Sequence, residues 1–150
     1  AVWDEKAVAE CMKYNEGDLI EITVGKDYNE NTKAVTINGI LKKKGSLLGY
    51  MGCESDAIGS AVTISVGCVD CVIIDKPASF ITVSHFEAAG LNIEDYQVVV
   101  VKQGYLFPEL RKLATLAILA LTPGATHQMV EKLEYKNFVP PVYPLQLSSN

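Results

Sequence analysis

The sequence has little positive charge. Its 150 residues contain 13 lysines and arginines against 18 aspartates and glutamates, which gives a net charge of −5 and a pI of about 5.0. Nucleic acids and anionic lipids are bound through basic faces, so we expect neither as a partner. No apolar run approaches the roughly 20 residues of a membrane-spanning helix, and the first residues show no basic-then-apolar signal pattern. We therefore expect a cytoplasmic protein that does not bind membranes.

Histidine is also scarce, since the sequence contains only His85 and His127. A hydrolytic zinc site needs three protein ligands, an open coordination position and a general base. Neither histidine has a carboxylate or a second histidine at motif spacing, and no serine or cysteine stands in a nucleophile elbow. We therefore predict no catalytic residue, no metal ligand and no cofactor in this chain.

Of the four cysteines, only Cys68 and Cys71 lie close together. A Cys-x-x-Cys pair can be half of a zinc site or a redox pair. A zinc ribbon needs a second such pair, however, and a redox pair opens a helix, whereas this pair lies between two strand patterns. We interpret the two thiols as flanking a hairpin turn and leave their role open.

What the chain does have is enough apolar residues, 49%, for one domain with a core. A helical pattern follows Asp4, and another follows Thr82 or Ser84 as the cap. A glycine-containing stretch without a clear period, residues 45–59, predicts a long loop. Alternating apolar and polar residues predict strands that pair as two antiparallel hairpins, at residues 19–25, 34–41, 60–66 and 72–74.

Residues 98–126 form the clearest unit of the sequence. The run at 97–102, with β-branched residues from Val98 to Val101, is typical of a strand buried on both faces, as parallel strands are. Pro108 and Glu109 then suit the first turn of a helix over 107–115, and residues 117–121 form a second apolar run. The spacing fits a parallel crossover. We predict a single α+β domain over residues 1–150, with antiparallel hairpins, one parallel strand-helix-strand crossover and three short helices.

This crossover predicts a ligand site. If the two strands are parallel, the loops that follow them leave the same edge of the sheet, where open α/β sheets bind ligands. The alternative interpretation is a surface lysine, a packed tyrosine and a stable turn. The candidate substrate-binding residues, which would converge on an anion such as a carboxylate, are Lys102, Tyr105, Thr122, Thr126 and His127.

Several segments, taken in order, resemble a known family. They are Trp3-Asp4, residues 58–62 and 86–91, Val99-Val100-Val101-Lys102-Gln103-Gly104-Tyr105-Leu106-Phe107-Pro108-Glu109-Leu110, residues 119–126 and residues 141–145. As an ordered set they resemble the C-terminal domain of the MlrC (microcystinase C) family of metallopeptidase-like hydrolases. The resemblance covers nearly the whole chain.

The resemblance implies that zinc and its ligands belong to a larger N-terminal catalytic domain, against which this chain packs. We therefore expect the chain to be a piece of a longer protein, inactive alone, that shapes the cleft for a peptide or amide substrate. Where many relatives have a lysine and a His-Phe-Arg pattern, this chain has Leu106-Phe107-Pro108, which leaves Lys102 as the expected cation. The alternative is a structural or assembly module that binds a partner chain without a catalytic role. A homo-oligomer is left open.

Overall fold

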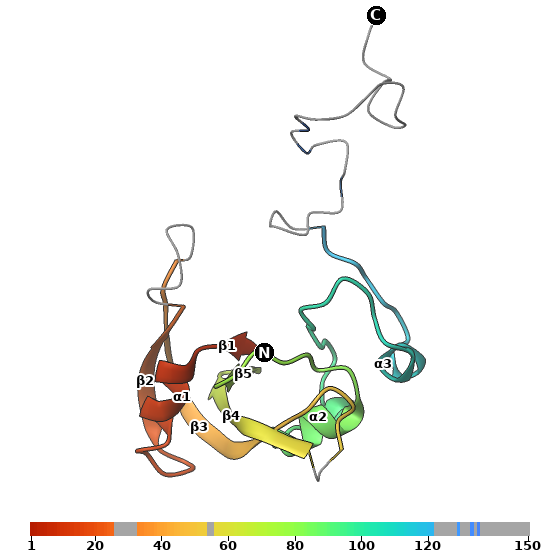
Figure 1. Ribbon diagram of the computed structural model, residues 1–150. Coiled ribbons are helices and arrows are strands. Elements are labelled where there is room, and N and C mark those ends of the chain that lie inside the picture. Colours follow the sequence, from red (N-terminus) through yellow and green to blue (C-terminus); the bar gives the residue numbers. More distant parts are fainter. Residues whose placement is uncertain (26–32, 54–55, 122–128, 130–132, 134, 136–150) are drawn as a thin grey trace, which may run out of the picture. The chain divides into compact units, whose positions relative to one another are not determined.

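The structure, a computed structural model, describes residues 1–25, 33–53, 56–121, 129, 133 and 135. The chain divides into two units, Ala1–Thr115 and Leu116–Asn150. All regular structure of the described residues lies in the first unit (Figure 1). Its helices are α1 (Glu5–Cys11), α2 (Val83–Ala88), the 3-10 helix η2 (Ile93–Asp95) and α3 (Pro108–Leu113). None of these described helices is long and apolar enough to cross a membrane.

Five strands form one sheet in the order β1-β5-β4-β3-β2. Successive strands from β2 to β5 pair antiparallel, and β1 pairs parallel with β5. The predicted α+β class, with antiparallel hairpins and three short helices, is confirmed. The strands are β1 (Val2–Trp3), β2 (Leu19–Val24), β3 (Val35–Leu48), β4 (Ala57–Val66) and β5 (Val69–Ile74).

The middle strand, β4, is covered on both faces. Its residues from Ala61 to Ile64 are all buried, although alternate side chains of a strand point to opposite faces. Val62 and Ile64 belong to the apolar core that contains α1, whereas Ala61 belongs to the core that contains α2. The sheet therefore separates two cores, one on each face.

Helix α1 begins as the sequence predicts. Asp4 is its N-cap, and one carboxylate oxygen accepts a hydrogen bond from the Ala7 amide at 3.0 Å. The other oxygen accepts from the Gly25 amide at 2.9 Å, so the same buried side chain also fixes the end of β2. Both oxygens of the buried Asp4 carboxylate therefore have hydrogen-bond donors, as buried polar groups require.

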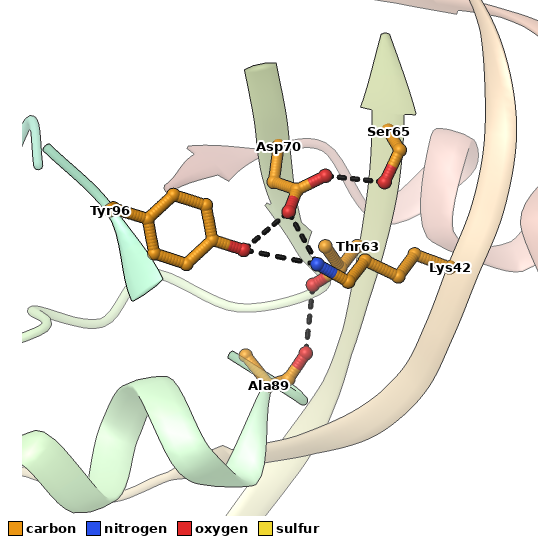
Figure 2. A network of polar contacts seen from close by, with 6 residues as sticks. All are labelled: Lys42, Thr63, Ser65, Asp70, Ala89 and Tyr96. Atoms are coloured by element: carbon orange, nitrogen blue, oxygen red, sulfur yellow. Dashed lines mark hydrogen bonds and ion pairs between the residues drawn. The ribbon is translucent and has the colours of Figure 1, made fainter. Parts of the chain in front are cut away.

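Helix α2 packs closely on the face of the sheet opposite to α1. The Thr63 hydroxyl, fully buried in β4, donates to the Ala89 carbonyl oxygen at 2.7 Å (Figure 2). On β3, a Cβ atom added to Gly45 would stand 2.1 Å from the Ala88 carbonyl oxygen. Helix α2 can therefore dock here only because position 45 has no side chain.

The predicted location of the parallel crossover is wrong. Residues 98–102 and 117–121 form no strand, and the parallel pair of the sheet is β1 with β5. Val98, Val100 and Ile118 are 77%, 80% and 81% exposed. The β-branched run has high strand propensity, but no neighbouring strand among the described residues supplies its hydrogen bonds or covers both of its faces. The helix between the two runs, α3, is confirmed, with Pro108 at its start.

The long glycine-containing loop predicted at 45–59 is also wrong. Strand β3 continues to Leu48 and β4 begins at Ala57, so the connection comprises only residues 49–56. Gly45 and Gly59 lie inside strands. These two strand positions are glycine because neighbouring atoms leave no room for a side chain. A Cβ at Gly59 would stand 2.2 Å from an Asp75 carboxylate oxygen.

The turn of the second hairpin lies two residues before the predicted one, which was to be flanked by Cys68 and Cys71. The turn is Gly67-Cys68, with a positive φ of 60° at Gly67, and not Val69-Asp70. Cys68 is therefore exposed in the turn itself, and Cys71 is half-buried within β5.

The close approach at Gly45 makes a testable prediction. We expect Gly45→Ala to lower the free energy of unfolding by about 1–3 kcal/mol, because the added methyl group forces α2 away from the sheet. Urea unfolding followed by circular dichroism measures this difference. Ser46→Ala, an exposed neighbour in the same strand, is the control and should change stability by less than about 0.5 kcal/mol. Equal stability of the two variants would contradict the packing argument.

Candidate ligand-binding face

A buried histidine organises the start of α2. His85 is only 1% exposed, and its Nε2 atom lies 2.9 Å from the Gly49 carbonyl oxygen. Its Nδ1 atom lies 2.6 Å from the Thr82 hydroxyl and 3.3 Å from the Thr82 backbone nitrogen. A carbonyl only accepts and a backbone N–H only donates. These contacts therefore assign the donor role to Nε2 and the acceptor role to Nδ1. His85 thus takes part in the capping box at the start of α2.

The same helix end also holds the turn between β3 and β4. The Gly52 amide donates to the Gly49 carbonyl oxygen at 2.9 Å, which closes a four-residue turn. The Ser84 hydroxyl donates to the Gly52 carbonyl oxygen at 2.7 Å. Gly52 has a φ of 68°, and a Cβ there would stand 2.3 Å from the Thr82 hydroxyl oxygen. The carbonyls at both ends of the turn are thus bound by side chains of α2.

The two central residues of this turn point outward. Tyr50 is 64% exposed and Met51 is 67% exposed. They stand between two anchored positions, so their backbone is held although their side chains are largely in water. An aromatic ring and a thioether are the kind of apolar groups that recognition surfaces use.

A second loop is tied to the same part of the structure. The Gln103 side chain donates from Nε2 to the Phe80 carbonyl oxygen at 3.0 Å. The Val83 amide, in the first turn of α2, donates to Glu109 Oε1 of α3 at 3.0 Å. The residues between these two ties, 104–108, are therefore held at both ends against residues 80–83.

Three aromatic rings meet where the two loops come together. The Tyr105 and Phe107 rings stack with centroids 5.0 Å apart and planes at 22°. The Tyr50 ring meets Phe107 edge-on, at 6.3 Å and 79°. We call Tyr50, Tyr105 and Phe107 the aromatic cluster. Tyr105 is 66% exposed, so the cluster is an open face and not a core.

The structure describes only two of the five predicted substrate-binding residues. Tyr105 belongs to the aromatic cluster. Lys102 is exposed three residues earlier, close to the chain start; burial lowers the pKa of the Ala1 amino group, and the charge of Lys102 lowers it further. Thr122, Thr126 and His127 lie outside the described residues. Convergence of the five residues on an anion stays a prediction. The two parallel strands from which it was inferred are not formed by residues 98–102 and 117–121.

Tyr50, Met51 and Phe107 were not predicted as site residues. One signal was present in the sequence, because Gly49 and Gly52 flank the Tyr-Met pair as the ends of a tight turn do. The contact of this turn with residues 105–107 joins segments more than 50 positions apart in the chain. Local patterns carry no information about such a contact.

A separate polar network connects η2 to the sheet (Figure 2). A bulge in β3 between Leu41 and Lys43 directs Lys42 towards Asp70, and its Nζ atom lies 2.6 Å from the carboxylate. The Ser65 and Tyr96 hydroxyls also donate to Asp70. Partial burial acts against the charged carboxylate, but these three donors outweigh it and hold the pKa of Asp70 below its usual range. With every donor paired, the network is a structural tie.

The described residues do not fit a zinc site. No group of three or more histidine, cysteine, aspartate or glutamate side chains in the described part of the chain is placed to hold a metal ion. All four cysteines are free, and burial is the main cause that raises the pKa of the Cys11 thiol, to about 11, and also that of Cys71. We assign no chemical step through a metal to these residues.

The fold and the face together define an α+β domain that offers exposed rings and no metal-holding group among its described residues. A family model, that of the MlrC C-terminus, matches residues 1–137. The chain belongs to the MlrC C-terminus family, as the sequence resemblance predicts. A comparison with curated proteins found no match.

The Asp70 network predicts a pH-dependent contribution to stability. The pKa of the Asp70 carboxyl is lowered in the folded chain from its ordinary value of 3.8. The carboxylate therefore stabilises the fold fully at pH values above 3.8, and this stability is lost as the pH falls through the pKa of the folded chain. We expect Asp70→Asn to reduce the free energy of unfolding by about 1 kcal/mol at pH 7, and the gap to close in acid. Urea unfolding between pH 7 and pH 3 measures it.

The control for this experiment is Glu94→Gln, an exposed carboxylate in η2, which should leave stability unchanged at both pH values. A gap between the chain and its Asp70→Asn variant that stays constant down to pH 3 would contradict the assignment of the effect to the carboxylate charge.

The geometry around His85 predicts its tautomer. We expect long-range ¹H–¹⁵N NMR spectra at pH 7.5 to show a hydrogen on Nε2 and none on Nδ1, because the Thr82 amide points at Nδ1. The His85 signals are assigned by their loss in His85→Gln. A hydrogen found on Nδ1 would mean that the contacts of the ring with Thr82 and Gly49 are not those described.

Proposed function

We propose that this chain is the accessory C-terminal domain of an MlrC-like zinc-dependent amide or peptide hydrolase. In this role it shapes the substrate cleft, while the metal site belongs to a separate N-terminal domain. The observation that carries the proposal is the match of the MlrC C-terminus model to residues 1–137. The lack of a metal-holding group among the described residues is consistent with it.

The arrangement of side chains supports a role in binding. Lys102 and Tyr105 lie on one short segment that Gln103 ties to the Phe80 carbonyl. An exposed lysine attracts a substrate carboxylate, and a neighbouring tyrosine offers both a ring and a hydroxyl. Neither side chain is needed to fill the core, since both are largely in water.

The surface of the same segment supports contact with another domain. Val98 and Val100 are exposed side chains on a stretch that forms neither helix nor strand. Contiguous exposed apolar side chains typically mark an interaction surface. A partner that covers them would bring Lys102, a few residues away, to the edge of the resulting interface.

The proposal is tested by joining this chain to an MlrC-type N-terminal domain. We expect the 150-residue chain alone to hold no stoichiometric zinc and to hydrolyse no peptide amide. The joined protein should bind zinc and hydrolyse the amide. In the joined protein, Lys102→Ala should raise KM for a substrate with a free carboxylate about tenfold, the loss of one charge-assisted hydrogen bond. Steady-state kinetics and metal analysis measure these effects.

Lys6→Ala is the matched control, because Lys6 is an exposed lysine of α1, which packs on the other face of the sheet. It should leave KM unchanged. If Lys102→Ala leaves turnover and KM unchanged while deletion of residues 49–53 abolishes association with the N-terminal domain, the accessory catalytic role is wrong. The chain would then be an assembly module.

A further inference from the structure

The turn that carries Tyr50 and Met51 combines exposed side chains with a fixed backbone. Its side chains are about two-thirds exposed, although burying one such side chain is worth roughly 1.5–3 kcal/mol. Its backbone is nevertheless fixed at both ends by His85 and Ser84. These two ties do not bury Tyr50 or Met51, so they hold the pair in place without adding it to the core.

The second loop shows the same combination. Tyr105 is exposed, but the segment is fixed by the Gln103 tie to Phe80 and by the Glu109 tie to the Val83 amide. Both loops are thus attached to one stretch, residues 80–85. Fixing exposed rings before a ligand arrives lowers the entropy lost on binding, which is how recognition sites gain affinity.

The chemistry of the face indicates what it would bind. Tyr105 stacks on Phe107 and Tyr50 meets Phe107 by its edge, so the cluster already shows both arrangements in which aromatic rings attract one another. No charged side chain belongs to the cluster, and Met51 adds a polarizable thioether beside it. These groups favour a flat apolar group and not an anion.

From these observations we propose that Tyr50, Tyr105 and Phe107 form a subsite that binds the aromatic side chain of a peptide-like ligand. That the ligand is peptide-like rests on the proposed function. That it carries an aromatic side chain rests on the geometry of the cluster. Lys102 lies outside the subsite and would reach a carboxylate of the same ligand, three residues from Tyr105 along the chain.

The test is an NMR titration of the 150-residue chain with N-acetyl-L-phenylalaninamide. We expect saturable shifts of the backbone amides of Tyr50, Met51 and Tyr105, and none with N-acetylglycinamide, which lacks the ring. Tyr50→Ala and Tyr105→Ala should each weaken binding about tenfold. Leu19→Ala, an exposed apolar residue of β2, is the control and should not change it.

A positioning variant separates the ring from its support. Ser84→Ala keeps all three rings but removes the donor to the Gly52 carbonyl. We expect it to weaken probe binding severalfold and to lower the ¹H–¹⁵N heteronuclear NOE of the Tyr50 and Met51 amides. Unchanged NOE values together with unchanged binding would show that the turn is not held as proposed.

The outcomes distinguish this inference from the proposed function. Absence of saturable shifts, or equal binding by the chain and its Tyr50→Ala variant in a spectrum that remains folded, overturns the subsite. Probe binding by the isolated chain, combined with an inactive joined protein, supports the subsite and overturns the hydrolase role. Activity in the joined protein without probe binding to the isolated chain supports the hydrolase role and overturns the subsite.

Discussion

The close contact of α2 with the sheet is the constraint on which the candidate face depends. Position 45 has no Cβ, so the end of α2 can lie against β3, and the buried Thr63 hydroxyl then fixes the Ala89 carbonyl. With that end held, the start of the helix brings His85 and Ser84 to the β3–β4 turn. A shift of α2 by the width of a methyl group would move both ties together, because they belong to one short rigid helix.

This dependence also explains why polar side chains are buried near the face. Thr63 and His85 are two of the three buried polar or charged residues described, with Asp4 the third. Each is hydrogen-bonded, which removes most of the cost of taking it out of water. A directional bond to a carbonyl fixes position in a way that apolar contact does not. The chain therefore uses its few buried polar groups where a loop or a helix end must be held.

Much of the fold could be predicted from local sequence. Alternation revealed β2, β3 and β4, and the caps at Asp4 and Thr82 marked α1 and α2, because these signals depend on neighbours within a few residues. The glycines at 45 and 59 could not be interpreted correctly in this way. A glycine that permits a turn and one that permits close packing are identical in sequence, and only the atoms of α2 and Asp75 distinguish them.

The run at Val98–Val101 shows where propensity stops being informative. Its β-branched residues suit a strand, yet the segment forms no strand. A strand also needs a neighbour for its hydrogen bonds, and no residue among those described is paired with this run in the sheet. Val98, Val99 and Val100 are exposed, whereas Val101 packs partly against the core that contains α2, so only the end of the run is covered. The local sequence gives the segment its apolar character, and its exposed side chains would become buried only through a surface that these residues do not themselves supply.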